Sequence, residues 1–466
     1  MKKFNIIKGP FIKSSDSTKR IMKHLLISLL PIILFSFYRL GILPYINGKT
    51  NIFGMFYPLI FIFIGTITSM ITEFIYTKIT NKDFSESYSI FPGLFLSLVL
   101  PINTPILVLI IGSILAILLG KAIYGGFGKN VFNPALIGIL LVITLYGSYI
   151  SQCGGYLTQY DVDVISSATP RTNLKLVDNI TYENVIEPYG SINNFFIGTI
   201  PGAIGETSAL LCLLAFIYLV IFKVIKKEIP IFYIGTVFIM SLIVSLLNGY
   251  GIWYPFFEIL SGGLFFGAVF MATDPVTSPV TKLGKIMYGI LLGILTFSFR
   301  HSGQVEAVML SILIMNMFVY IIDKIGIRNE SIKNKTIIIS IILILLVIFL
   351  PFKFIEKKET DPNFNIISKE NINDSTVYTV TERGNGGLIK IEITLKEGIA
   401  ISYKVLENNE TEAYYNKVIS EGYIDKLLQN QNDLNNVDTV SGATISSTAL
   451  KKALINVLEE QQWKKK

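Results

Sequence analysis

Residues 104–124 read TPILVLIIGSILAILLGKAIY, and Lys121 is the one charged residue in this run. An α-helix needs about 20 mainly apolar residues to cross the roughly 30 Å hydrocarbon core of a membrane. The run at 86–101 is short and contains Pro92 and Gly93, which favours a broken or half helix there. Apolar runs recur along the chain, and we predict eleven spans, at 21–45, 52–77, 86–101, 104–124, 132–150, 206–225, 229–248, 255–273, 283–299, 303–322 and 336–353.

The composition supports a membrane protein. Of the 466 residues 51% are hydrophobic and 16% are charged, whereas soluble domains carry about 25% charged residues. These proportions exclude a disordered chain and an entirely soluble enzyme. Two cysteines, Cys153 and Cys212, are too few for a four-thiolate iron–sulfur cluster or a disulfide scaffold. Two histidines, His24 and His301, argue against an all-histidine metal or haem site, so a redox centre in this chain must be something other than iron, and we expect no metal site.

Lysine and arginine alternate between the segments that join the spans. Such residues gather on the cytoplasmic side of membrane proteins, so the net charge of +7 indicates topology and not nucleic-acid binding. With the N-terminus inside, the outer segments carry few of them, among them Arg171, Lys175 and Arg300. Eleven spans then place everything after Phe354 outside. The inner segments carry Lys2, Lys3, Lys8, Lys13, Lys19, Arg20, Lys23, Lys78, Lys82, Lys121, Lys129, Lys223, Lys226, Lys227, Lys282, Lys285, Lys324, Arg328, Lys333 and Lys335.

The chain becomes polar after Lys357, and residues 359–466 are enough for one small domain. GLIKIEITL and IAISYKVL alternate apolar and polar residues on either side of 396–398, which predicts a β-hairpin. TEAYYNKVISEGYIDKLLQ and STALKKALINVLEEQQW have helical spacing. We therefore expect a polytopic α-helical membrane protein of about ten helices at 1–330, an eleventh tethering helix at 336–353, and a small α+β domain at 359–466 outside the cytoplasm.

One motif occurs twice. Residues 163–170 read DVISSATP and residues 438–445 read DTVSGATI, and both fit D-x-[VI]-S-x-A-T. Asp163, Ser166, Ala168 and Thr169 thus match Asp438, Ser441, Ala443 and Thr444. On the predicted topology both copies face outside. The match at four fixed positions leads to the hypothesis that the two segments have the same function.

A threonine hydroxyl among small residues is a candidate site for a phosphoester. The helix predicted after Thr444 would present free N–H groups to a phosphate. The alternative is that Ser446 simply caps this helix. The first copy favours the phosphoester, because Thr169-Pro170 leads into a polar stretch with no clear helix.

The tail motif, SGAT followed by Ser446 and Ser447, resembles the covalent FMN site in the G subunit of the Rnf electron-transport complex, which corresponds to the C subunit of the sodium-translocating NADH:quinone reductase. The membrane part resembles the D subunit of Rnf, or the B subunit of the reductase. The segments that carry this second resemblance are KAIYGGFGKNVFNPALIG (121–138), IPGAIGETSAL (200–210) and SGGLFFGAVFMATDPVTSPVTKLGK (261–285). Together the two resemblances cover roughly 20–330 and 335–460, as in a fusion of the D and G subunits.

The resemblance implies an FMN joined through its phosphate to each motif threonine, Thr169 and Thr444, with a separate flavin transferase to attach it. It implies a non-covalent riboflavin as well, and the A, B, C and E subunits of Rnf as partners. Two positions depart from the family. Ser167 stands where glycine is usual, and LENNETEAYYNK lacks the glycines of a loop that usually covers the flavin. The expected cofactor-binding residues are Thr169, Thr444, Ser166, Ala168, Ser441, Gly442, Ala443, Glu206, Thr207 and Ser208, with no catalytic residue besides.

Three further patterns have two interpretations each. Gly202 to Ser208 either cap the span that follows or form a wall of the first flavin site. GGFGKNVFNP and MATDPVTSP, on the inner side, either line a cavity or pack helices tightly. The acids in or near spans either mark an ion path or lie at the interface, and because most are near helix ends we favour the interface; they are Glu73, Glu258, Asp274, Glu306 and Asp323.

The sequence therefore predicts a membrane flavoprotein that relays electrons in a ferredoxin:NAD oxidoreductase of the cell membrane, coupled to Na⁺ or H⁺ transport. The rival class is a non-redox channel or transporter with an extracellular binding domain. The repeated motif favours the electron carrier, because a channel has no need of it.

Overall fold

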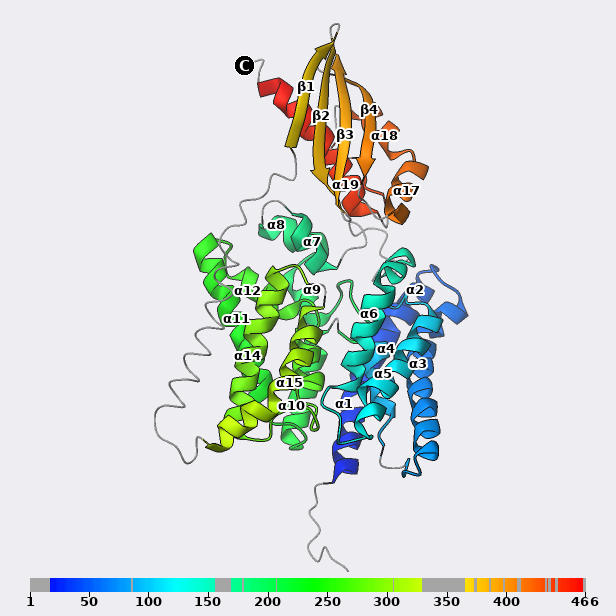
Figure 1. Cartoon of the computed structure of the whole chain (residues 1–466), viewed down its shortest axis with the longest axis vertical. Coiled ribbons are helices and arrows are strands. Elements are labelled where there is room, and N and C mark those ends of the chain that lie inside the picture. Colours follow the sequence, from blue (N-terminus) through cyan, green and yellow to red (C-terminus); the bar gives the residue numbers. More distant parts are fainter. Residues whose placement is uncertain are drawn as a thin grey trace, which may run out of the picture.

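The computed structural model describes residues 17–84, 87–155, 169–177, 180–206, 208–304, 306–328, 365–372, 375–384, 387–396, 399–408, 412–431, 434, 437–440 and 443–463. Figure 1 shows a bundle of helices followed by a separate four-stranded sheet with helices. The tethering helix expected at 336–353 lies outside the described residues.

The first half of the bundle runs from α1 to α6. Its elements are α1 (Thr18–Phe37), η1 (Tyr38–Ile42), α2 (Leu43–Ile46), α3 (Ile52–Ile79), α4 (Ile90–Val99), α5 (Ile106–Gly120), η2 (Ala122–Tyr124) and α6 (Pro134–Gln152). Four short helices follow, α7 (Pro170–Leu176), α8 (Tyr182–Val185), η3 (Glu187–Tyr189) and α9 (Ile192–Ile197). The second half comprises α10 (Ala209–Ile221), α11 (Glu228–Asn248), α12 (Trp253–Leu260), α13 (Leu264–Phe266), η4 (Gly267–Met271), α14 (Lys282–His301) and α15 (Ala307–Arg328).

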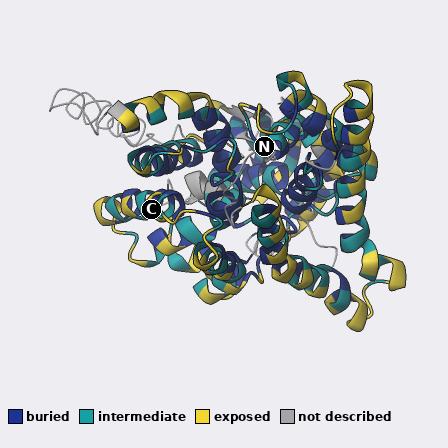
Figure 2. Ribbon diagram, turned by 90° about the horizontal axis from the view of Figure 1, so that it is seen from below, coloured by how far each residue is buried: buried dark blue, intermediate teal, exposed yellow. Residues whose placement is uncertain are grey.

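Each of the ten spans predicted before residue 330 has a helix in the described part of the chain. Seven of these helices are long and apolar enough to cross a membrane, one more is a bent pair, and α4 and α10 are shorter. The outward faces of the helices are apolar, with Ile79 and Leu246 each 75% exposed, and Figure 2 shows exposed residues on the rim around a buried interior. Such a surface suits lipid contact. The chain is a multi-pass membrane protein.

The half helix predicted around Pro92 is confirmed. α4 has ten residues, which corresponds to about 15 Å of helix and half of a hydrocarbon core. Pro92 lies in its first turn, where a missing N–H costs no helical bond. Leu100, before Pro101, is extended, as expected for a residue that precedes proline. The end of α4 is therefore set by local sequence.

The span predicted at 255–273 is not one straight helix. α12 and the α13–η4 segment are bent by 59° at Ser261–Gly263. The two glycines at the bend adopt φ values of +64° and +66°, a conformation that a side chain disfavours. The bend thus follows from Gly262 and Gly263.

The two halves of the bundle repeat one packing pattern. In the first half α3 packs on α4 and α5, α5 on α6, and α4 on α6. In the second half α11 packs on α12 and α14, α14 on α15, and α15 on η4. Each half has five successive helical segments in the same packing order, and the third of each is short (α4) or bent (α12 to η4). Short or interrupted hydrophobic segments at corresponding positions of two halves are a feature of transporters.

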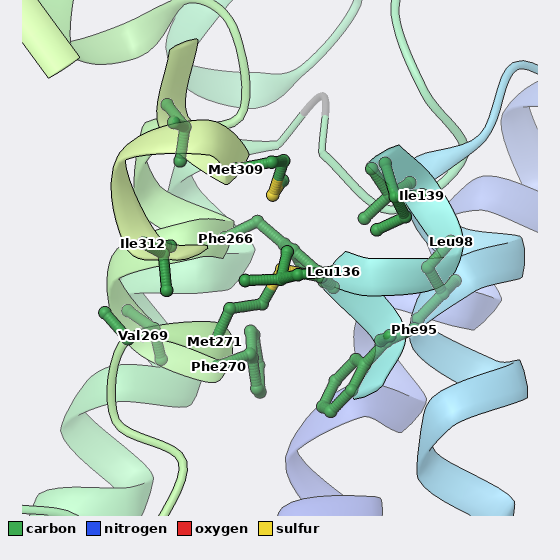
Figure 3. Close-up of a cluster of buried hydrophobic side chains, with 14 of the residues drawn as sticks. Phe95, Leu98, Leu136, Ile139, Phe266, Val269, Phe270, Met271, Met309 and Ile312 are labelled. Atoms are coloured by element: carbon green, nitrogen blue, oxygen red, sulfur yellow. The ribbon is translucent and has the colours of Figure 1, made fainter. Parts of the chain in front are cut away.

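The interrupted helices of the two halves meet in an apolar cluster (Figure 3). The Phe95 ring on α4 lies 6.0 Å from that of Phe266 and 6.3 Å from that of Phe270, measured between ring centroids. α6 and α15 flank this contact with Leu136, Ile139, Met309 and Ile312. The centre of the bundle is thus filled by side chains.

The C-terminal domain is an antiparallel sheet in the order β1-β2-β3-β4. Its elements are β1 (Asn365–Ile372), β2 (Ser375–Arg383), β3 (Leu388–Lys396), β4 (Ile399–Asn408), α17 (Glu412–Ser420), α18 (Tyr423–Gln429) and α19 (Thr444–Trp463). β3 buries Ile389, Ile391, Ile393 and Leu395 in the core that α19 completes with Leu450 and Leu454. The β3–β4 hairpin and the helices were predicted, whereas β1 and β2 were not. The predicted fold class, a polytopic helical membrane protein followed by a small α+β domain, is confirmed.

Candidate functional site

The bend between α12 and α13 is stabilised by a buried arginine. The last carbonyls of a helix have no partner within that helix. Arg300, near the end of α14, donates to the carbonyl oxygens of Ser261 at 3.0 Å and Gly262 at 3.3 Å, and also to that of Glu258. The guanidinium therefore supplies the positive charge at the carboxyl end of α12.

Glu258 joins this arginine to a second one. Its Oε2 atom lies 2.9 Å from Arg171 Nη1 and 3.2 Å from Arg300 Nη1, and its side chain is fully buried. Arg171 also donates to the Ser261 hydroxyl at 3.3 Å. We call Arg171, Glu258 and Arg300 the Glu258 cluster. A buried charge is tolerated when paired and hydrogen-bonded in this way.

The Glu258 cluster explains two of the arginines expected on the outer side. Arg171 and Arg300 neutralise a buried acid, so neither is a topology signal. The preference for interfacial acids was wrong for Glu258 and also for Glu73, which is 1% exposed and lies 3.0 Å from Lys121 Nζ. Asp323 accepts hydrogen bonds from the N–H groups of Val280 and Thr281 at the start of α14.

Thr169 begins a helix, contrary to the expectation that no helix follows it. Its hydroxyl oxygen accepts from the N–H of Thr172 at 3.3 Å and lies 2.9 Å from the Thr172 hydroxyl. Thr169 is therefore the N-cap of α7, with Pro170 at the first helical position, a favoured arrangement. The expectation that no helix follows the first copy of the motif was wrong. This copy therefore gives no support to the phosphoester over the helix cap. Ser166 and Ala168 lie outside the described residues.

The segment before α10 is anchored to the first half of the bundle. The Gly205 N–H donates to the Leu98 carbonyl of α4 at 2.7 Å, and the Ser36 hydroxyl of α1 donates to the Ile204 carbonyl. Ser208 is buried and caps α10, since its hydroxyl accepts from the Leu211 N–H at 3.3 Å. The capping interpretation thus holds for Ser208, while Thr207 lies outside the described residues.

Arg171 and Glu206 approach the two adjacent glycines of the bend, Arg171 at Gly262 and Glu206 at Gly263. A Cβ built on Gly262 would lie 2.6 Å from Cδ of Arg171, two residues after Thr169. A Cβ built on Gly263 would lie 2.5 Å from the carboxyl carbon of Glu206. The fold therefore brings two of the segments singled out in the sequence together at the α12–α13 bend, though they are more than 30 residues apart.

Thr444 is the first residue of α19, a helix of 20 residues, and is partly exposed. The preceding turn is closed by Ser447, whose hydroxyl accepts from the Val440 N–H at 3.1 Å and donates to the Ala443 carbonyl at 3.0 Å. Ala443 and Ser446 are buried, and Ser441 and Gly442 lie outside the described residues. A partly exposed hydroxyl at the head of a long helix fits a phosphoester. Because α19 begins before Ser446, that residue is not its cap.

The acid of the tail motif, Asp438, lies near a tyrosine. Burial, with the Asp438 carboxylate nearby, raises the pKa of Tyr423 to about 12. The tyrosine therefore keeps its proton at every physiological pH and offers a neutral donor beside the turn that leads to Thr444.

A pocket of about 70 Å³ opens between the two halves where α6 begins. Both segments that were expected either to line a cavity or to pack helices form its wall. The first segment contributes Phe127, Asn130 and Asn133, and the second contributes Thr273 and Asp274. Of the two interpretations of these segments, the one in which they line a cavity therefore holds.

Comparison with known proteins identifies both parts of the chain. Residues 5–333 match the NQR2, RnfD, RnfE family, and residues 384–459 match the FMN-binding domain. The D subunit of the proton-translocating ferredoxin:NAD(+) oxidoreductase complex of Clostridium ljungdahlii is 34% identical over 69% of this chain and 94% of its own length. The D subunit of the Na(+)-translocating complex of Acetobacterium woodii is 30% identical over 68% of this chain and 91% of its own.

The similarity extends to the quinone-reductase relatives. The B subunit of the Na(+)-translocating NADH-quinone reductase of Ectopseudomonas mendocina is 33% identical over 54% of this chain and 62% of its own length. The family matches cover the helical bundle and, in the sheet domain, the part from β3 into α19. The chain belongs to the NQR2, RnfD, RnfE family and carries an FMN-binding domain after its membrane part.

Proposed function

We propose that this chain is the flavin-carrying membrane subunit of an ion-translocating ferredoxin:NAD oxidoreductase of the Rnf type. The observation that carries the proposal is the joining, in one polypeptide, of the family's membrane part with an FMN-binding domain. The subunit would relay electrons through covalently bound FMN, coupled within the complex to Na⁺ or H⁺ transport.

The tail cofactor is proposed to be an FMN joined through its phosphate to Thr444. FMN supplies electron-transfer chemistry that side chains lack. The chain's own contribution is the hydroxyl that forms the ester, the N–H groups at the head of α19, and the small residues Ser441, Gly442 and Ala443. The turn closed by Ser447 fixes this hydroxyl relative to the domain core.

A second FMN is proposed on Thr169, with Ser166 and Ala168 as the small residues before it. Arg171 and its ion pair with Glu258 hold the start of α7 against the bend. Glu206, Thr207 and Ser208 are proposed as one wall of this site. The support is the shared approach of Arg171 and Glu206 to Gly262 and Gly263.

The proposed partners are the A, B, C and E subunits of Rnf, a flavin transferase that forms both esters, and membrane lipid around the apolar outer faces. The rival function, a non-redox transporter, has support in the two matching halves, whose third segments are short or bent. The FMN-binding domain argues against it, since transport alone requires no flavin.

Deletion of the chain tests this function. Membranes with the whole complex should reduce NAD with ferredoxin as the electron donor, and membranes that lack this chain should lose the activity to background. Re-expression of the wild-type chain should restore it. A complex that assembles without this chain and reduces NAD at the normal rate would contradict the proposed role.

We also propose that the α7 end of the bundle and the domain at 359–466 face outside, with the helix at 336–353 as tether. Cys153, an exposed residue just after α6, reports on the α7 end. In a Cys153→Ser background, Asn408→Cys reports on the exposed end of β4. Both cysteines should react with an impermeant thiol reagent in intact cells.

The matched control is Lys129→Cys in the same background, because Lys129 is exposed where α6 begins. It should react only after lysis. If Lys129→Cys reacts in intact cells and Asn408→Cys does not, the orientation is the reverse, and the two proposed flavins do not face outside.

A further inference from the structure

Glu206 carries an acid into the space that Gly263 leaves open at the α12–α13 bend. A Cβ on Gly263 would lie 2.6 and 2.7 Å from its two carboxyl oxygens. The Oε1 atom is buried and has no hydrogen-bond partner among the described residues. The anchors on Gly205 and Ile204 hold the segment in place. A carboxyl with one buried and unsatisfied oxygen, held rigidly, is costly as an anion.

Each element packed around Glu206 carries a charged or titratable group near its carboxyl. Glu306, before α15, repels a second negative charge, and Cys212 on α10 lies within the field of Glu206. Arg300 on α14 attracts the anion, but its guanidinium is already hydrogen-bonded to Glu258 and to the carbonyls of the bend. Arg171 on α7 is likewise paired with Glu258. Burial first, and Glu306 second, raise the pKa of Glu206 well above that of an ordinary glutamate.

We propose that Glu206 is a proton-binding site, a carboxyl that takes up a proton from the α7 side when the charge beside Thr169 becomes more negative and releases it when that charge is lost. The part of this inference that concerns Thr169 rests on the proposed function. The proton site itself rests only on the Glu206 carboxyl, its unsatisfied Oε1 atom and the charged groups around it.

The geometry favours a proton over a metal cation. A sodium ion at Glu206 would lie close to the guanidinium of Arg300 and would be repelled. The carbonyls of Ser261 and Gly262, which would otherwise coordinate it, already accept from Arg300. A proton needs no further ligands, and it neutralises the Glu206 carboxylate in its observed position.

The exchange conserves charge. An FMN on Thr169 would supply the electron transfer, and one electron received from a one-electron donor of the complex would add one negative charge there. The Glu206 carboxylate would take one proton from solvent and form one O–H bond, which adds one positive charge. When the next acceptor removes the electron, this O–H bond would break and the proton would return to solvent. The net charge around the α12–α13 bend is unchanged throughout.

Infrared spectroscopy of the purified chain tests the proton site without reference to flavin. The wild-type protein should show the carbonyl stretch of a protonated carboxylic acid that persists above the pH range of an ordinary glutamate, and Glu206→Gln should remove it. Glu306→Gln should keep the band but move its titration to lower pH, because a neighbouring negative charge is gone. Glu206→Gln should leave the melting temperature at pH 7 unchanged or raise it, since glutamine mimics the neutral acid.

Three results would overturn the proposal or its link to the flavin. Absence of the band, or a large loss of melting temperature in Glu206→Gln, means an ionised acid. A melting temperature that rises with Na⁺ but loses this response in Glu206→Gln means a cation site instead. The Thr444→Ala variant would keep only the flavin on Thr169, and the midpoint potential of that flavin should vary with pH. Adding Glu206→Gln to this variant should make the potential vary less with pH. An unchanged pH dependence refutes the link, whereas lack of any flavin on Thr169 refutes the proposed function and leaves the infrared result standing.

Discussion

Removal of either motif threonine is expected to stop ferredoxin-driven NAD reduction by the whole complex, to the rate of membranes that lack this chain. The reason is that we propose the two flavins as consecutive stations on one path. Only a few residues separate the predicted tether at 336–353 from the domain at 359–466. A short tether keeps a linked domain at an effective concentration of the order of millimolar at its docking site. Such a fusion suits two centres that must meet repeatedly.

The variants Thr169→Ala and Thr444→Ala should therefore each lose all turnover, while each retains one of two flavins and the complex stays assembled. Thr169→Ala also removes the N-cap of α7, a cost of about 1 kcal/mol. Thr169→Asn separates the two effects, because asparagine caps a helix but has no hydroxyl to esterify, and it too should be inactive.

The matched controls are Thr172→Ala, which removes the hydroxyl 2.9 Å from that of Thr169, and Thr448→Ala one turn into α19. Both should keep near wild-type rates in the membrane assay. A Thr444→Ala complex that assembles and turns over normally would show that the tail flavin is off the path.

Among single substitutions, loss of the Glu258 carboxyl is expected to cause the largest loss of stability of the membrane part. Glu258→Ala leaves the buried guanidinium of Arg300 and the partly buried one of Arg171 without their shared anion. Removing one partner of a buried ion pair costs about 3–5 kcal/mol. The measurement is the melting temperature and the monodisperse yield of the full chain in detergent, and both should fall sharply.

A second variant makes this prediction specific to charge. Replacing Glu258 by leucine together with Arg171 and Arg300 by methionine removes all three charges at similar volume. It should recover the part of the loss that unpaired charge causes, but not the hydrogen bonds from Arg300 to the carbonyls of the bend. Glu407→Ala breaks the surface pair with Lys390, where Glu407 is 74% exposed, and should change the melting temperature little. A melting temperature of Glu258→Ala equal to that of wild type would mean that the cluster is not formed.

The spans and the tail hairpin were predictable because their signals are local. A run such as 104–124 has the length that a membrane demands, and β3 alternates strictly between buried and outward residues. β2 gives a weaker signal, since Val377 and Tyr378 are adjacent apolar residues that face opposite sides. α7 is short, and Thr169 followed by Pro170 was its one available signal.

The Glu258 cluster was not predictable, because its members are separated by 87 and 42 residues. No local pattern links an arginine after α6 to an acid in α12. The presence of arginines in segments that should lack them was a clue, since a charge against the topology rule needs a partner. Two adjacent glycines, Gly262 and Gly263, mark the bend in the sequence. The residues on both sides of them are apolar, so the pattern predicted a single span there.

Peptide mass mapping of the purified chain after proteolysis tests the two proposed flavin sites most directly. We predict that the peptide with Thr169 and the peptide with Thr444 each carry the mass of one FMN joined with loss of water, and that Thr169→Ala and Thr444→Ala each lose only their own adduct. Unmodified peptides at both threonines, in a chain taken from a complex that reduces NAD, would contradict this prediction.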